Sequence, residues 1–210
     1  MPLSRRQSLL LLLTAPAVPA ALSYPARAAG TEQAAAFIKR TGDALVAAVN
    51  GPGSAAEKER KLAAIIGGAV AVDRIGRFVL GQFWRMATAE QRARYLALFR
   101  QLIVFNITGQ MNAYKGVAFT MGRAVPRDAE DVFVATTVTR PGQPPTEVQW
   151  DVNSAGGTLK ILDVVVAGTS LRQTQRSEYA SVITRNGVTI PPLLAAMKAQ
   201  LARLRASASG

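Results

Sequence analysis

The stretch TEVQWDVN, residues 146–153, decides the fold of this chain. Glu147, Gln149 and Asp151 alternate with three apolar residues, which are Val148, Trp150 and Val152. Successive side chains of a β-strand point to opposite faces of a sheet, so this alternation predicts a strand with one wet face and one buried face. A half-buried strand needs partners, and the flanking sequence supplies them.

Three further segments have the composition of strands, at residues 117–125, 131–140 and 159–167. Turn-forming residues separate the four segments at 126–128, 141–145 and 154–157, where proline, glycine, aspartate and serine gather. Connections this short join antiparallel neighbours. The region therefore predicts a four-stranded antiparallel meander.

The sequence has helical periodicity both before and after the four predicted strands. Before the sheet we expect four helices. The first runs from a Thr31 N-cap to residue 49, and the second runs from Ser54 to Gly67. The third covers 72–80 and ends at Gly81, and the fourth runs from a Thr88/Gln91 capping box to about Tyr114. After the sheet we expect helices over 171–185, capped by Thr169 or Ser170, and from Pro191 onward. The helix predicted from Thr88 to about Tyr114 is apolar around more than half of its circumference, so other parts of the protein must cover it on two sides. The class is α+β, with a curved four-stranded antiparallel sheet and helices packed on one side of it.

Composition excludes several kinds of chemistry. Of 210 residues, 49% are hydrophobic and 18% charged, which is enough apolar mass for a substantial core. Cysteine and histidine are both absent, which removes disulfides, thiol nucleophiles, Cys/His zinc sites and imidazole catalysis. The chain has no G-x-S-x-G, P-loop or dinucleotide fingerprint. We therefore predict no catalytic residue, no metal and no cofactor, and the sequence offers no support for Ser-Lys chemistry.

The first 28 residues have the layout of an export signal. Arg5 and Arg6 precede an apolar stretch at 9–22, and Ala26 with Ala28 fits an A-x-A cleavage rule. Fourteen apolar residues are too few for a membrane span of about 20. We expect cleavage after Ala28, by either the Sec or the twin-arginine route, and one domain over 29–210. An exported protein without a cysteine for lipid attachment is expected in the periplasm of a cell with two membranes.

The expected mature chain is strongly basic. Without Arg5, Arg6 and Arg27 it has 22 basic and 13 acidic residues. Such a surplus favours anionic partners, among which nucleic acid, acidic protein faces and phospholipid headgroups all qualify.

Three segments together resemble the MlaC family, the periplasmic phospholipid-binding components of an ABC lipid-transport system, also known as toluene-tolerance auxiliary proteins. The segments are LGQFWRMAT at 80–88 followed by Gln91, Arg92 and Phe99; Tyr114-Lys115-Gly116; and KILDVVVAGTSL at 160–171 followed by RSEY at 176–179. The sequence departs from the family pattern at Thr169, where valine is usual, and at Leu159, where tryptophan is frequent. A hopanoid-associated branch of the family fits the same residues.

The resemblance implies a monomeric carrier that shuttles glycerophospholipid between outer-membrane and inner-membrane complexes, without catalysis, nucleic-acid binding or stable membrane insertion. The alternatives are a carrier of hopanoid or another apolar lipid, and a protein-binding adaptor whose core is solid. The lipid tails would lie in an apolar cavity between sheet and helices. The residues then expected to contact lipid are Phe99, Leu102, Ile103, Ile107, Met111, Phe119, Met121, Phe133, Trp150, Val164, Val166, Thr169 and Leu171. Taken alone, most of these would be ordinary core residues.

Two polar features allow more than one interpretation. The corner at Gly168, Thr169 and Ser170 is either the mouth of the pocket, with helix N–H groups available to a phosphate, or an ordinary capped helix start. Asp163 is a lone carboxylate in a strand, which favours a structural hydrogen-bond acceptor over a catalytic group.

Overall fold

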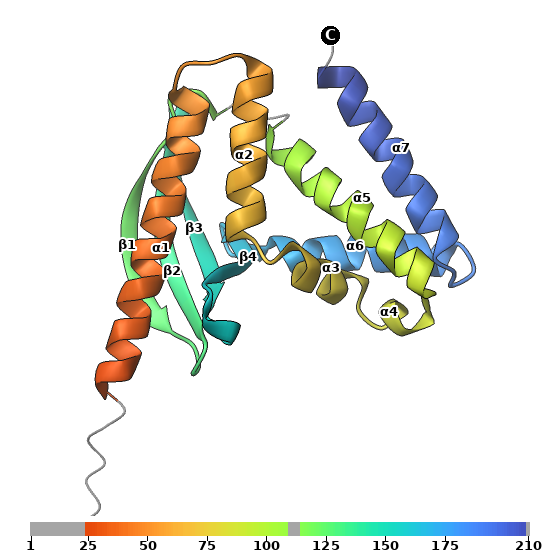
Figure 1. The fold of residues 1–210 in the computed structure, drawn as a ribbon, viewed down its shortest axis with the longest axis horizontal. Helices are drawn as coiled ribbons and strands as arrows, with labels where there is room; N and C mark the ends of the chain where they lie inside the picture. Colours follow the sequence, from red (N-terminus) through yellow and green to blue (C-terminus); the bar gives the residue numbers. More distant parts are fainter. Residues whose placement is uncertain (1–23, 109–113, 209–210) are drawn as a thin grey trace, which may run out of the picture.

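The computed structural model describes residues 24–108 and 114–208. The elements in chain order are α1 (Tyr24–Asn50), α2 (Ala55–Ala69), α3 (Val72–Leu80), α4 (Phe83–Met86), α5 (Ala89–Thr108), β1 (Ala118–Pro126), β2 (Asp131–Arg140), β3 (Gln143–Asn153), a 3-10 turn (Ala155–Gly157), β4 (Lys160–Val166), β5 (Thr169–Ser170), α6 (Leu171–Arg185) and α7 (Pro191–Ala208) (Figure 1). The α+β class predicted from the sequence is confirmed.

The sheet contains five antiparallel strands in the order β1-β2-β3-β4-β5, one more than the four predicted. The extra strand forms because the chain reverses at Ala167 and Gly168, which have φ angles of 47° and 82°. Two consecutive residues with positive φ give the tight turn that suits a two-residue hairpin. Thr169 and Ser170 consequently pair with Val166 and Val165 before α6 begins.

Several helix boundaries agree with the sequence prediction. Helix α3 ends at Gly81, whose φ is 56°, and α7 starts at Pro191. The backbone N–H of Glu57 donates to the Ser54 hydroxyl at the start of α2, and the N–H of Gln91 donates to the Thr88 hydroxyl ahead of α5. The side chains of Glu57 and Gln91 in turn accept from the backbone N–H groups of Ser54 and Thr88, so both capping boxes are present.

The start of α1 was predicted wrongly. Thr31 lies inside α1, which already begins at Tyr24 in an alanine-rich stretch with high helix propensity. The predicted end of α5 near Tyr114 stays a prediction, because α5 is described to Thr108 and residues 109–113 are outside the described residues. Tyr114 itself lies just ahead of β1. The short helix α4 was not anticipated.

The hairpin between β2 and β3 is tighter than predicted. Gln143 pairs with Arg140, so only Pro141 and Gly142 form the turn. Pro144 and Pro145 are tolerated in β3 because they fall at the register shift between Val138 and Arg140 of β2, and because β4 extends only to the level of Val148. Prolines in sheets occur at such irregularities and at positions without a neighbouring strand.

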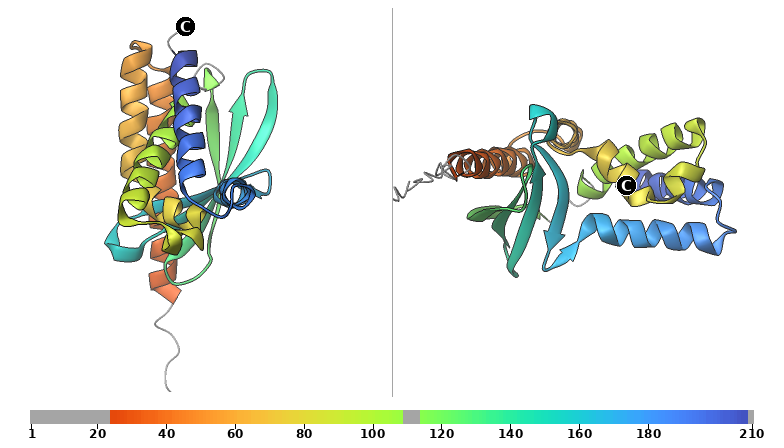
Figure 2. Two further views of the ribbon diagram at one scale, coloured as in Figure 1. Left: turned by 90° about the vertical axis from the view of Figure 1, so that its right-hand side faces the viewer. Right: turned by 90° about the horizontal axis from the view of Figure 1, so that it is seen from below.

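The hydrophobic core has two parts. One lies in what we call the sheet unit (α1, α2 and β1–β5), where Ala34, Ile38, Ala69, Val132, Val134, Val152 and Ile161 are buried together. The other lies in what we call the helical lobe (α3–α7), around Tyr95, Phe99 and Tyr179, whose rings are in mutual contact. Figure 2 shows α1 and α2 against one face of the sheet and the lobe extending beyond the edge formed by β4 and β5.

Candidate functional site: an apolar cavity between the sheet and the helices

A cavity of about 490 Å³ lies where the two parts of the molecule meet. Its walls come from α1, α2, α3, α5, α6 and the strands β2–β4. Most of the lining is apolar and consists of Leu45, Ile65, Ile66, Ala69, Val70, Ile75, Val79, Phe99, Ile103, Ile107, Val138, Val148, Trp150, Ile161, Leu162, Val164, Val166 and Leu171. Ile107 and Leu171 stay 41% and 50% exposed, so they mark two places where the cavity reaches the surface.

A second compartment of about 170 Å³ lies between α1 and the sheet. Its own walls include Val46, Val49 and Phe119, and the ring of Phe119 lies directly against Gly42 of α1. The two compartments have five lining residues in common, which are Leu45, Ile107, Tyr114, Val138 and Trp150. They therefore adjoin and form a branched apolar space.

Trp150 is fixed at the centre of this space by hydrogen bonds. Its indole Nε1–H donates to the Thr136 hydroxyl at 2.9 Å, and that hydroxyl donates to the carbonyl of Val148 at 3.3 Å. The polar atom of the indole is thereby satisfied without water, and the ring can present its apolar surface to the cavity.

The structure brings eight of the thirteen predicted lipid-contact residues into the lining of the two compartments: Phe99, Ile103, Ile107, Phe119, Trp150, Val164, Val166 and Leu171. For the predicted residues of α5, the face of the helix decides whether they line the cavity. As the sequence predicted, α5 is covered on two sides, with Phe99, Ile103 and Ile107 toward the cavity and Leu102 in the lobe core with α7.

The remaining predicted contacts lie elsewhere. Met121 packs against the core of the sheet unit, and Thr169 is exposed outside the lining. Phe133 alternates with the buried Val132 and Val134, so it is on the opposite face of the sheet, under the Arg127 guanidinium at 5.2 Å. Met111 lies outside the described residues. Lipid contact by any of the thirteen residues stays a prediction.

Sequence reasoning missed the contributions of α1, α2 and Tyr114. Leu45, Val46 and Val49 of α1 and Ile65, Ile66 and Ala69 of α2 line the compartments. Their apolar spacing indicates a buried helix face. It does not reveal whether that face meets side chains or a cavity.

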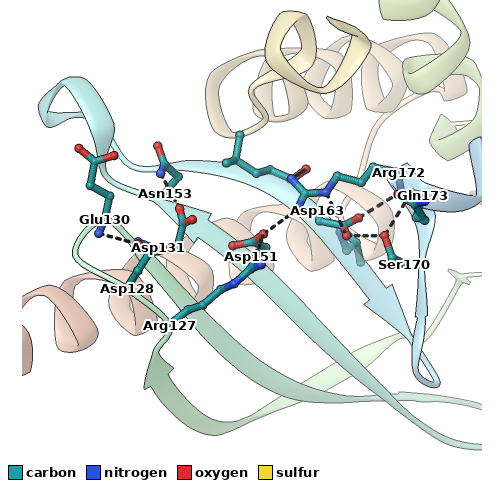
Figure 3. Close-up of polar contacts among 12 residues, drawn as sticks. Arg127, Asp128, Glu130, Asp131, Asp151, Asn153, Asp163, Ser170, Arg172 and Gln173 are labelled. Carbon is teal, nitrogen blue, oxygen red and sulfur yellow. Dashed lines mark hydrogen bonds and ion pairs between the residues drawn. The ribbon is translucent and has the colours of Figure 1, made fainter. Parts of the chain in front are cut away.

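Asp163, at one end of the larger compartment, is a hydrogen-bond acceptor that organises the start of α6 (Figure 3). Its carboxylate accepts from the Ser170 hydroxyl at 2.5 Å and from the backbone N–H groups of Val164 and Arg172 at 2.8 and 3.1 Å. Ser170 in turn accepts from the N–H of Gln173. These protein acceptors occupy the N–H groups of Arg172 and Gln173, so the corner is a capped helix start.

Asp151 lies beside Asp163 in the sheet register and is 2% exposed, although alternation predicted a wet face. Two arginines cover this part of the face: Arg172 Nη2 is 3.2 Å and Arg127 Nη1 is 3.5 Å from Asp151 Oδ2 (Figure 3). Within residues 24–108 and 114–208, Oδ1 has no hydrogen-bond partner. Burial is the main reason that the pKa of Asp151 lies above its ordinary value, and the charge of Asp131 adds to the effect.

Two kinds of structural feature are absent from the described residues. No group of three or more acidic, histidine or cysteine side chains is placed to hold a metal ion there. In the same residues, no helix combines the length and apolar character required to cross a membrane.

The fold and cavity define an α+β protein with a branched apolar space between a sheet and a helical lobe. Over residues 26–199 the chain matches the family described as MlaC protein, and it belongs to that family. It is 24% identical to toluene tolerance protein ttg2D of Pseudomonas putida over 145 residues, which cover 69% of this chain and 67% of the relative.

A solved structure shares the fold. It is the phospholipid-binding protein from Ralstonia solanacearum in complex with a phospholipid, with a TM-score of 0.71 and 22% sequence identity. The match covers 82% of this chain and 98% of that one.

Proposed function

We propose that this protein is a periplasmic carrier that binds glycerophospholipid in the branched cavity and moves it between inner-membrane and outer-membrane transport complexes. The observation that carries the proposal is the apolar cavity of about 490 Å³ with its adjoining compartment. Membership of the MlaC family and the fold shared with a phospholipid-binding protein support it. The protein would act by binding alone, with no catalytic residue, metal or cofactor.

Lipid transfer through water makes a physical demand that this architecture meets. Two acyl chains expose roughly 30 methylenes, and at about 0.8 kcal/mol each the barrier to leaving a bilayer exceeds about 20 kcal/mol. A carrier removes most of that barrier if it offers the chains an apolar space. The cavity lies within the range of about 300–1,000 Å³ that is typical of ligand sites.

The periplasmic assignment rests on the basic and apolar start of the chain. The export signal would be cleaved after Ala28, by the Sec or the twin-arginine route. N-terminal sequencing of protein recovered from the periplasm tests this: a first residue of Ala29 supports it, and an intact Met1 contradicts it.

Native mass spectrometry of protein purified without added lipid tests the binding proposal. We expect a mass increment equal to one glycerophospholipid. A hopanoid increment would redirect the proposal to that class of lipid. A consistently empty protein would contradict lipid carriage and favour the adaptor alternative.

A matched pair of variants shows whether the lipid occupies this cavity. Val138→Trp fills the point where the two compartments meet, and we expect it to lower lipid occupancy. Val125→Trp makes the same change on β1 at a position that is 48% exposed and outside both linings, so occupancy should match the parent. Equal occupancy in the two variants would place the lipid elsewhere.

A further inference from the structure

Two arginines line the larger compartment, and their surroundings differ. Arg172 lies at the start of α6, and Arg140 lies at the end of β2, beside the hairpin. Arg140 pairs with Gln143, whereas Arg172 lies at the level of Asp163 and Asp151. Gln143 and Asp151 are eight positions apart along β3, which is roughly 26 Å at the rise of a strand.

The positive charge of Arg172 is already compensated. Its Nη2 is 3.2 Å from Asp151 and its Nε is 3.4 Å from Asp163, both buried carboxylates. Its guanidinium also lies 4.7 Å from the centre of the Phe78 ring. An anion entering beside Leu171 would therefore meet two carboxylates together with the arginine. The negative charges of the carboxylates would repel the anion.

Arg140 has no such compensation. Its guanidinium lies 5.2 Å from the centre of the Tyr114 ring, and no carboxylate of the described residues lies within ion-pair distance of it. The residue is half-buried at the cavity wall. A guanidinium in this setting can bind a phosphate through two parallel N–H···O bonds.

The branch point of the cavity lies at the same end. Tyr114 and Val138 line both compartments, and Val138 is two residues before Arg140 on the same face of β2. Ile107, one of the two exposed apolar residues of the lining, also lines both compartments. The two apolar compartments thus meet near Arg140, whose positive charge is uncompensated.

We propose that Arg140 is the anchor for the phosphate of the bound lipid, with the headgroup at the β2–β3 hairpin and one acyl chain in each compartment. This inference rests on the proposed function and adds the orientation of the lipid and the residue that sets it. It places the headgroup at the hairpin and not at the corner of Gly168, Thr169 and Ser170, which was one of the two interpretations that the sequence allowed for that corner.

Replacement of the charge tests the anchor. Arg140→Gln should lower the affinity for phosphatidylglycerol about tenfold or more, the effect expected for a lost charge-assisted hydrogen bond, while Arg140→Lys should recover part of it. Arg123→Gln is the matched control, because it removes the same charge from the exposed surface of β1 outside both linings. Affinity would be measured by titration of delipidated protein, with the melting temperature as a check on folding.

The outcomes separate the anchor from the proposed function. Lipid bound equally by the parent, Arg140→Gln and Arg123→Gln proteins would overturn the anchor and leave lipid carriage intact. A parent that binds no lipid would overturn both. Displacement of the lipid by inorganic phosphate alone would also overturn the inference, because it would show a free-phosphate site that does not require acyl chains.

Cross-linking tests the orientation without a substitution. A phosphatidylglycerol with a photoactivatable headgroup, bound to the unmodified protein, should label residues 138–146. Labelling confined to residues 167–172 would place the headgroup at the opposite end and overturn the inference.

Discussion

Val166 and Thr169 are cross-strand partners at the edge of the sheet, yet only Val166 lines the cavity. A glutamate at position 166 would place an unpaired charge in an apolar wall, at a cost of several kcal/mol. The same residue at exposed position 169 can keep its carboxylate in water. Position along one hairpin thus decides whether a charge is tolerated.

We therefore expect Val166→Glu to lower lipid occupancy strongly and Thr169→Glu to retain it. Native mass spectrometry of both variants, alongside the parent, checks this. Loss of lipid in Thr169→Glu with retention in Val166→Glu would return Thr169 to the site.

A second prediction at the residue scale concerns Asp151 and the pH dependence of stability. Its folded-state pKa is raised by burial, so the folded protein holds the proton more tightly than the unfolded chain does. The contribution of this group to stability is therefore present at low pH and is lost as the pH rises through the folded pKa. Asparagine has no such dependence.

We expect the unfolding free energy of Asp151→Asn, relative to the parent, to fall as the pH is lowered from 7 toward 4. Asp128→Asn is a control of opposite sign, because backbone N–H groups of Glu130 and Asp131 hold the pKa of Asp128 below its ordinary value. For that variant the relative stability should rise over the same range. Parallel curves for the two variants, from urea unfolding at each pH, would contradict the assignment.

At the scale of elements, the start of α6 joins the sheet to the helical lobe. The hydroxyl of Ser170 accepts from Gln173 N–H and donates to the buried carboxylate of Asp163. One side chain thus caps the helix and satisfies a buried acid. A cap with both roles should matter more than a surface hydroxyl.

Ser170→Ala should lower the free energy of unfolding by about 1–2 kcal/mol. Ser177→Ala is the control within the same helix, because its exposed hydroxyl only donates to the Gln173 carbonyl one turn earlier. Its effect should be close to zero in the same urea titration. A similar loss in both variants would indicate that general helix propensity, and not the cap, sets the cost.

At the scale of the whole molecule, positive charge is unevenly distributed. Residues 72–108 and 171–206 of the helical lobe contain 12 basic and three acidic residues, whereas residues 24–71 and 114–170 contain 11 and ten. Nearly all of the surplus therefore lies on the lobe. A field of this kind steers anionic partners toward one end of the molecule.

If the carrier docks to acidic faces of the transport complexes, reversal of lobe charges should slow association. We expect Arg94→Glu with Lys198→Glu to lower the association rate with the inner-membrane complex several-fold at low salt. Arg60→Glu with Lys61→Glu makes the same charge change on α2 and should have a smaller effect. The difference should shrink between about 0.01 M and 0.15 M salt, as the Debye length falls from about 30 to 8 Å; equal effects at both salt concentrations would exclude steering.

Local patterns in the sequence predicted much of this molecule. The alternation at 146–153, the helix start at Ser54, the capping box at Thr88 and the glycine stop at Gly81 depend only on neighbours along the chain. They therefore predicted β3, the starts of α2 and α5 and the end of α3. The three segments that resemble the MlaC family predicted the family to which the chain belongs.

Contacts between residues far apart in sequence required the tertiary structure. An apolar face looks the same whether it meets side chains or a cavity, so periodicity could not separate Ile103 in the lining from Leu102 in the lobe core. Asp151 is buried because Arg127 and Arg172 arrive from other elements, and Arg140 stands out because no acid arrives beside it from the described part of the chain. Residue types and local spacing determined the elements, whereas the distances between elements decided which side chains enclose a space and which charges stay uncompensated.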